Sequence, residues 1–258
     1  MSLKEFNVWD GVYASFDGAP SVGDGFAGSI WRERSLQAAR NEANKLTNGR
    51  TLDYSLRQRN AILPVVTAML LSRQARVRIL DFGGGLGTAF MVLKYAIGNE
   101  IERVDYHVVE IDGICRAGRD LFGSGIGPAF ESELPAQGGF DIVYASSVMQ
   151  YIEDWRGAAS RLAGYGAPYL LFGDVFIGSF TSFVTLQNYY DSRIAHWFIN
   201  EDEFITEIRS QHYNLALRST CDACIFGVYG RLPMDNFPVE LRLPHTAHLL
   251  FAKLDKKS

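Results

Sequence analysis

The sequence predicts a doubly wound α/β fold: a mostly parallel sheet of about seven strands, helices on both faces and an N-terminal helical and irregular extension. Two observations lead to this prediction. From Val77 onward, short apolar segments alternate with helix-like segments, and a glycine-rich turn follows the first apolar segment. The composition agrees, because 47% of the 258 residues are hydrophobic and 21% are charged, which is typical of a globular protein.

Residues 1–75 are expected to form an arm and helices that act as a lid or cap on a main domain over residues 76–258, with an insertion around 176–200. The first 30 residues contain five glycines among several aromatic side chains, so we expect them to be irregular and to pack onto the main body.

Two helices are expected to follow, over Trp31–Leu46 and Tyr54–Leu71, with a break at Thr47-Asn48-Gly49. Pro64 should kink the second helix or mark its restart, because proline lacks a backbone N–H group.

The main domain is expected to alternate strands and helices along the chain. Strands are predicted over Val77–Leu80, Val104–Val109, Phe140–Ala145, Tyr169–Phe172, Leu215–Thr220 and Thr246–Lys253, and helices over Thr88–Ala96, Gly113–Phe122, Trp155–Leu162 and Glu201–Ser210. In such sheets ligands bind beyond the carboxyl ends of the strands. Functional residues are therefore expected directly after the strands.

The strongest motif is Asp81-Phe82-Gly83-Gly84-Gly85-Leu86-Gly87, which follows a predicted strand and opens a predicted helix. The dinucleotide fingerprint G-x-G-x-x-G does not fit, because Thr88 occupies the place of its third glycine. An acid followed by glycines at alternating positions resembles the first motif of class I S-adenosylmethionine-dependent methyltransferases, whose fold is Rossmann-like. This resemblance implies that Asp81, Gly83, Gly84, Gly85 and Gly87 contact S-adenosylmethionine.

A second acid is expected at the end of the next strand, where it would bind the ribose hydroxyls. Glu110 fulfils this requirement 23 residues after Gly87; Ile111 beside it is included in the predicted site, and Asp112 is the second choice for the ribose. Farther along the chain, Glu131 is placed at the adenine edge and Ser146 along the cofactor. Glu110 would serve a nicotinamide dinucleotide equally well, so an oxidoreductase remains an alternative, as does a cofactor-binding module without activity.

Four segments together resemble a poorly characterised family of methyltransferases associated with bacterial surface-polysaccharide biosynthesis: Trp9–Tyr13, Ile79–Gly87, Ser147–Tyr151 and His196–Phe198. This resemblance implies a sugar or glycan-linked acceptor. Without it, the acceptor is a small molecule of unspecified class.

Transfer of a methyl group to a hydroxyl is helped by a general base that takes the hydroxyl proton. Asp174, after a predicted strand, and His196, expected in a loop before the helix that begins near Glu201, are the catalytic candidates. Asp174 would otherwise cap a turn, and His196 would otherwise be structural. Gln150, Tyr151, Trp197 and Tyr13 are the predicted substrate-binding residues.

A net charge of −4 argues against a nucleic-acid partner. The longest apolar run, Ala61–Leu71, is 11 residues long, whereas a membrane-spanning helix needs about 20. The N-terminus shows no secretory signal pattern, so a cytoplasmic protein is expected, and a homodimer remains open. Because the sequence shows no carboxylate–histidine cluster, no metal is expected. The lone C-x-x-C of Cys221 and Cys224 leaves a metal or redox role and plain apolar packing as alternatives.

Overall fold

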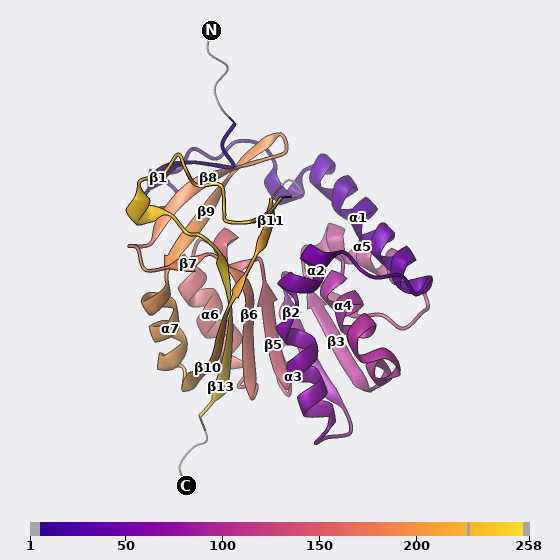
Figure 1. The fold of residues 1–258 in the computed structure, drawn as a ribbon. Coiled ribbons are helices and arrows are strands. Elements are labelled where there is room, and N and C mark those ends of the chain that lie inside the picture. Colours follow the sequence, from indigo (N-terminus) through magenta and orange to yellow (C-terminus); the bar gives the residue numbers. More distant parts are fainter. Residues whose placement is uncertain (1–5, 226–227, 255–258) are drawn as a thin grey trace.

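The computed structural model describes residues 6–225 and 228–254 of the chain. Its main sheet has seven strands in the order β10-β13-β6-β5-β2-β3-β4 (Figure 1). Neighbouring strands from β6 to β4 pair in parallel, whereas β13 is antiparallel to both β6 and β10. The strands are β2 (Val77–Phe82), β3 (Val104–Val109), β4 (Ala129–Glu131), β5 (Ile142–Ser146), β6 (Tyr169–Val175), β10 (Tyr213–Cys221) and β13 (Thr246–Lys253). The predicted α/β class and mostly parallel sheet are confirmed.

Helices cover both faces of the sheet because alternate residues of each strand point to opposite sides. Leu80 and Val143 pack with α6 (Trp155–Gly164) and α7 (Glu201–Ser210) in one core. Their neighbours Ile79 and Ile142 pack with α3 and α4 in the other core. Those helices, together with α5 beside β4, span Ile62–Leu71, Thr88–Ile97 and Asp112–Phe122.

The segment expected to form one helix, Tyr54–Leu71, forms two: α2 (Tyr54–Arg59) and α3. Pro64 lies in the first turn of α3, where its missing N–H group breaks no hydrogen bond, so it accompanies a restart. The preceding helix, α1 (Ser29–Thr47), ends before Gly49, which adopts a left-handed φ of 63° in the predicted break.

A second sheet, of order β1-β8-β9-β7, corrects one expectation and contains strands that were not predicted. The first 30 residues are not irregular throughout, because β1 (Trp9–Tyr13) pairs with β8 (Phe183–Tyr189). The 176–200 insertion consists mainly of strands: β7 (Ile177–Gly178), β8 and β9 (Ser192–Asn200). Trp9 forms an aromatic core there with Phe176 and Phe198. The strand β1 was not predicted because it contains a glycine, which is unfavourable in strands, and because its partner β8 is far away in the sequence.

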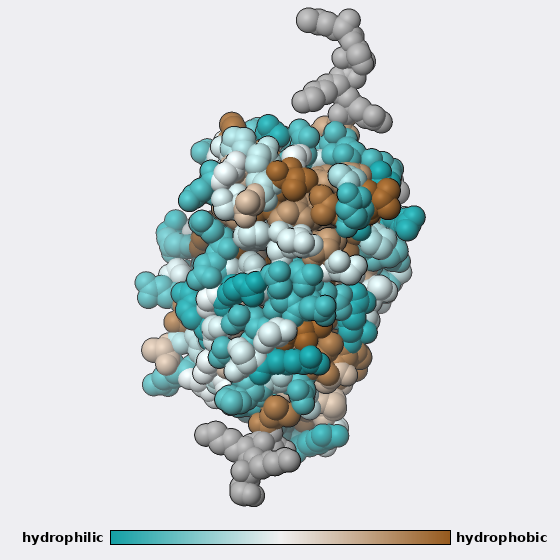
Figure 2. All heavy atoms as spheres, turned by 90° about the vertical axis from the view of Figure 1, so that its left-hand side faces the viewer, coloured by the Kyte–Doolittle hydropathy of each residue, from teal (hydrophilic) through white to brown (hydrophobic). Residues whose placement is uncertain are grey.

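The remaining short elements are η1 (Gly25–Ala27), η2 (Gly98–Arg103), η3 (Met149–Tyr151), η4 (Val239–Leu241), β11 (Ala223–Ile225) and β12 (Val228–Gly230). In Figure 1 the second sheet and α1 lie above the main sheet, at the end where the N-terminus is marked. On the described residues of the face that carries α7, hydrophilic side chains predominate and hydrophobic ones form small separate patches (Figure 2). Among the described helices, none has the length and apolar character needed to cross a membrane.

Candidate functional site

A cavity of about 1250 Å³ lies at the carboxyl ends of the parallel strands. Residues that follow β2, β5 and β6 line its floor, α1 and α2 line one side, and the turn between β8 and β9 lines another. The cavity therefore lies where a doubly wound sheet is expected to bind its ligand, and the second sheet helps to enclose it.

The glycine loop after β2 forms part of this cavity, and its shape depends on glycine. Gly83, Gly85 and Gly87 have left-handed φ angles of 68°, 56° and 74°. A Cβ atom on Gly84 would overlap the Asp81 carboxylate, and one on Gly83 would overlap Val148. A Cβ on Gly85 would instead meet no atom within 4 Å. Since Gly85 lines the cavity, this open space is available to a ligand.

Asp81 lies beneath the loop and is 1% exposed. Its Oδ2 accepts a hydrogen bond of 2.7 Å from the Tyr106 hydroxyl. Burial raises the pKa of Asp81 to about 7, Tyr106 opposes this shift, and the charge of Glu110 adds to it. A cation in the cavity would favour ionised Asp81, since its carboxylate holds few other compensating contacts.

Glu110 begins the segment after β3 and is attached to the glycine loop. Its Oε2 accepts from the Gly85 N–H at 3.4 Å, and its Oε1 accepts from the Ile111 N–H at 2.9 Å. Burial raises the pKa of Glu110, and both backbone hydrogen bonds oppose the shift. Glu110 borders the cavity through Gly85, while Ile111 is exposed and Asp112 forms an ion pair with Arg116 on the surface.

Two polar residues in unusual backbone conformations end the neighbouring strands β5 and β6. Ser147 has a φ of 57° and Asp174 a φ of 48°. On β6 the pairing with β13 shifts, so that Gly173 and Asp174 lie opposite His248 alone, which forms a β-bulge. Left-handed φ angles cost energy for non-glycine residues and concentrate at functional sites. Ser147 and Asp174 both line the cavity, and the Ser147 hydroxyl donates a hydrogen bond of 2.9 Å to Asp174 Oδ2.

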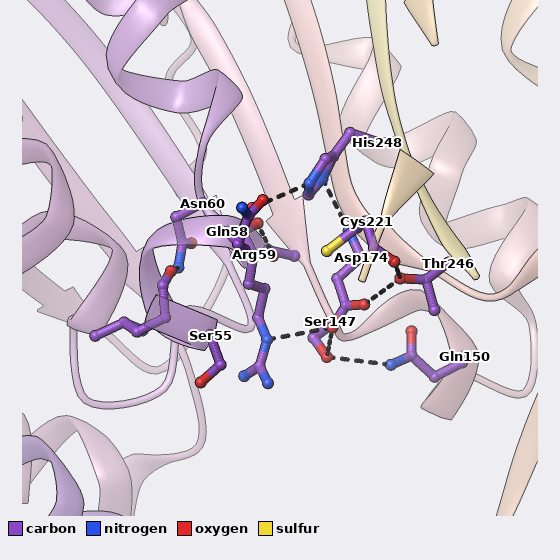
Figure 3. Close-up of polar contacts among 12 residues, drawn as sticks. Ser55, Gln58, Arg59, Asn60, Ser147, Gln150, Asp174, Cys221, Thr246 and His248 are labelled. Carbon is purple, nitrogen blue, oxygen red and sulfur yellow. Dashed lines mark hydrogen bonds and ion pairs between the residues drawn. The ribbon is translucent and has the colours of Figure 1, made fainter. Parts of the chain in front are cut away.

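Asp174 is the centre of a polar network (Figure 3). Besides Ser147, its carboxylate accepts from the Thr246 hydroxyl at 2.6 Å and forms an ion pair of 3.2 Å with Arg59 Nε. Its backbone N–H donates to His248 Nδ1 at 3.2 Å, while His248 Nε2 lies 3.1 Å from the Gln58 carbonyl. This pattern requires the neutral His248 tautomer with its proton on Nε2. Burial lowers the pKa of His248, which favours that neutral form.

Aromatic side chains also line the cavity. Phe26 contacts Tyr151 and Tyr189, with ring centroids 4.7 Å and 5.5 Å apart, and Arg34 lies 5.0 Å from the Tyr190 ring centroid. The Tyr151 hydroxyl donates to Gln187 Oε1 at 2.8 Å, which fixes the ring. We call Phe26, Trp31, Tyr151, Tyr189 and Tyr190, all of which line the cavity, the aromatic wall.

The structure brings several predicted site residues together at this cavity. Its lining includes Asp81, Gly83, Gly84, Gly85, Ser146, Tyr151 and Asp174. Gly87 begins α4 just behind the loop, and Gln150 is fully buried, with its amide 3.5 Å from the Ser147 hydroxyl.

Gly87, Glu110, Ile111 and Gln150, described above, are outside the lining, and so are four further predicted residues: Glu131, Trp197, Tyr13 and His196. Glu131 bonds to His107 Nδ1 at 2.6 Å, Trp197 donates to the Glu153 carbonyl, and Tyr13 pairs within the second sheet. The expectation that His196 lies in a loop is wrong: it lies within β9 and is 0% exposed, and neither of its ring nitrogens has a hydrogen-bond partner among the described residues. Burial lowers the pKa of His196 to about 3, because the surrounding aromatic side chains cannot stabilise its charge.

Arg59, Thr246 and His248 were not predicted, although they hold Asp174 in place. Arg59 comes from a helix before the main domain, and the other two come from the last strand. The sequence contains no local motif that links residues so far apart. For Thr246 and His248, the sequence offered only the prediction that the last strand lies in the sheet, beside another strand.

The part of the chain that the structure describes contains no group of three His, Cys, Asp or Glu residues that could hold a metal ion. Cys221 is buried as a free thiol beside Thr246, and burial raises its pKa to about 12. The side chain of Cys224 lies outside the residues that the structure describes.

No protein-family model matches the sequence, and no curated protein matches it. Solved structures do resemble the fold. Magnesium protoporphyrin IX methyltransferase from Synechocystis PCC 6803 with bound S-adenosylmethionine aligns over 88% of this chain and 96% of its own, with 13% identity and a TM-score of 0.50.

Two further structures agree with that likeness. The 1,6-didemethyltoxoflavin-N1-methyltransferase of Burkholderia thailandensis, with its substrate and S-adenosylhomocysteine bound, has 17% identity and a TM-score of 0.52 over 91% of this chain and 94% of its own. A S-adenosylmethionine-dependent methyltransferase from Clostridium acetobutylicum has 12% identity and a TM-score of 0.51 over 82% and 96%. At these identities the chain shares the fold of such enzymes, and the predicted Rossmann-like class is confirmed.

Proposed function

We propose that this protein transfers a methyl group from S-adenosylmethionine to a small-molecule or glycan-linked acceptor. One observation carries the proposal. The glycine loop, with Asp81 beneath it and Glu110 bonded to Gly85, opens onto the same cavity as the Asp174 network. A cofactor-binding loop and a polar reaction centre thus share one enclosed space on a fold that known methyltransferases use.

The residues at the loop suit this cofactor. Asp81 and Glu110 have raised pKa values through burial, and Asp81 also through Glu110, so a ligand with positive charge would relieve an unfavourable concentration of acids. Carboxylate oxygens also accept hydrogen bonds from ribose hydroxyls, which is the role proposed for Glu110. When bound, S-adenosylmethionine supplies an electrophilic methyl group on a sulfonium. The open space at Gly85 allows close approach to the backbone.

We assign Asp174 as the group that receives the proton of an acceptor hydroxyl. Its carboxylate lines the cavity and is oriented by three donors, which leaves acceptor capacity for a further hydrogen bond. His196 does not suit this role, because it does not line the cavity and burial holds its pKa at about 3. The choice of a hydroxyl as the methylated group rests on the presence of this candidate base.

The acceptor should be flat or have an apolar face, because the five side chains of the aromatic wall line the cavity and aromatic rings pack well against such surfaces. Sugar rings and planar aromatic molecules both fit this description. The cavity, at about 1250 Å³, exceeds the ~300–1,000 Å³ usual for a single ligand, so it can hold a cofactor and an acceptor together. A glycan-linked acceptor is supported by the sequence resemblance to the polysaccharide-associated family.

The test is a transfer assay with methyl-labelled S-adenosylmethionine and a panel of hydroxylated aromatic compounds and nucleotide sugars. The wild-type protein should label at least one acceptor, and Asp174→Asn should lower kcat by about 10²-fold or more while S-adenosylhomocysteine still binds. Asp235→Asn is the matched control, since Asp235 is exposed and its carboxylate pairs, among the described residues, only with Arg242. If Asp174→Asn matched this control on an acceptor that the wild type methylates, the assigned role of Asp174 would be wrong.

A further inference from the structure

Arg59 has unused hydrogen-bonding capacity inside the cavity. It is the last residue of α2, and its side chain lines the cavity and reaches toward Asp174 (Figure 3). Only its Nε is engaged, in the 3.2 Å ion pair with Asp174. Within the described chain, neither Nη atom has a hydrogen bond or ion pair, although the side chain is 43% exposed into a cavity rather than on an outer surface.

A guanidinium group has five N–H donors in a planar fork, and four of them are on the Nη atoms. Such a fork binds carboxylate and phosphate groups through two parallel hydrogen bonds. The Asp174 contact fixes the plane of the fork, because Asp174 is itself held by Ser147 and Thr246. The free edge of Arg59 is therefore preorganised for an anion.

The charge of Arg59 is maintained under all ordinary conditions. Burial lowers the pKa of Arg59, but Asp174 foremost among the surrounding groups raises it, and the net direction is upward. Its field also reaches the aromatic wall. Burial raises the pKa of Tyr189 to about 12 and the Arg59 charge opposes that shift, so the guanidinium is within electrostatic range of this ring.

Other cations of the cavity wall are less available for this role. Lys45 forms an ion pair with Glu42 on α1, and Arg34 lies over the Tyr190 ring. Arg50 also lines the cavity, but it is an exposed residue of the segment between α1 and α2, and no contact with Asp174 orients it as it does Arg59. Arg59 is also close to the proposed reaction centre, since its backbone carbonyl accepts a hydrogen bond of 3.4 Å from the Ser146 hydroxyl at the end of β5.

We propose that the two Nη groups of Arg59 bind a carboxylate or phosphate group of a ligand in this cavity. This inference rests on the proposed function, and it narrows the acceptor to a molecule with an acidic group, unless the acidic group is the cofactor's own carboxylate. The two sources share one chemistry, and binding measurements separate them.

The experiment uses the full chain and isothermal titration, with Arg59→Gln, Arg59→Lys and Arg57→Gln as variants. Arg57 is the matched control on the same helix; it does not line the cavity and its Nε bonds to the Leu52 carbonyl. Inorganic phosphate and benzoate are titrated with and without saturating S-adenosylhomocysteine. S-adenosylhomocysteine is also titrated alone, beside methylthioadenosine, which has no carboxylate.

If the acceptor supplies the anion, Arg59→Gln should weaken phosphate or benzoate binding at least tenfold and leave S-adenosylhomocysteine binding unchanged. If the cofactor supplies it, the same variant should weaken S-adenosylhomocysteine at least tenfold and methylthioadenosine not at all. Arg59→Lys, which keeps the charge without the fork and should fold even if the Gln variant does not, should show a smaller loss of the same kind.

Unchanged binding of all four probes in both Arg59 variants, or equal losses in Arg57→Gln, would overturn the anion site. Failure of the wild type to bind S-adenosylhomocysteine would instead refute the proposed function. The phosphate and benzoate titrations without cofactor would still decide the role of Arg59 in that case.

Discussion

Substitution of Gly85 by alanine tests the cofactor loop with a matched control elsewhere in the chain. Gly85 has a φ of 56° and open space where a Cβ would lie. Gly98, at the end of α4, has a φ of 58° and equally open space. Its ψ of −129° is at least as demanding for a side chain. Because α4 has ten residues, about 15 Å of helix separates Gly98 from the loop.

Each substitution places alanine in a left-handed conformation, which costs about 1–2 kcal/mol, partly offset by about 0.4–1 kcal/mol from the restricted unfolded chain. Thermal unfolding should therefore show a net loss of about 1 kcal/mol for Gly85→Ala, and at least as much for Gly98→Ala. Calorimetric titration with S-adenosylhomocysteine should show at least tenfold weaker binding, about 1.4 kcal/mol, for Gly85→Ala alone. Equal affinities in the two variants would refute the placement of the cofactor at this loop.

Three further predictions concern the acids and the buried histidine. Glu110→Gln should weaken the binding of S-adenosylhomocysteine by about 10- to 100-fold in a titration, because a charged hydrogen bond to the ribose is worth about 1.5–3 kcal/mol. Asp112→Asn, on the surface, should leave this binding unchanged. Equal effects of the two substitutions would show that Glu110 does not bind the ribose. Asp81→Asn should gain stability relative to wild type as pH rises from about 4 to 7, by at most about 1.4 kcal/mol per pH unit, because in this range the carboxyl of the unfolded chain ionises while the buried one keeps its proton. His196→Leu should behave oppositely in denaturant titrations and gain stability relative to wild type as pH falls below about 6.5, since the unfolded histidine binds a proton that the buried one rejects. The same variant should keep its transfer activity, and loss of activity in a stably folded His196→Leu would show that His196 serves the reaction.

The fold of the main domain could be predicted from the sequence because each element has a local signal. The Gly83–Gly87 loop, for example, lies between an apolar strand and a helix that adjacent residues specify. The second sheet could not be predicted in this way. The strand at Trp9–Tyr13 contains a glycine and depends on pairing with residues near 187, so its stability comes from contacts that no local pattern contains.

The residues of the candidate site likewise fall into those with a local sequence signal and those that depend on distant contacts. Asp81 and Asp174 were predicted because each comes after a predicted strand, Val77–Leu80 or Tyr169–Phe172, at the edge where ligands bind. In the structure both lie near the carboxyl ends of β2 and β6. His196 was misplaced because its polar character indicated a loop, whereas packing against Trp9 and Phe176 places it in a buried strand. Arg59 could not be predicted as a partner of Asp174, because 115 residues separate them and only the tertiary fold brings α2 beside the end of β6.

The aromatic residues show a similar limit. The segment after Tyr165 is rich in aromatic side chains, which could belong either to an acceptor pocket or to a core. Phe183 and Phe198 instead stack in the core of the second sheet, while Tyr189 and Tyr190 reach the cavity. Spacing alone cannot separate these sets, because strand residues alternate between the two faces and the register depends on partners.

The central claim is that the cavity at Gly83–Gly87 binds S-adenosylmethionine. Calorimetric titration of the wild-type chain with S-adenosylhomocysteine, and in parallel with NADH, tests this claim most directly. The account predicts one molecule of S-adenosylhomocysteine bound per chain and no saturable binding of NADH. Saturable binding of NADH without any binding of S-adenosylhomocysteine would contradict it and would identify the site as one for a nicotinamide cofactor.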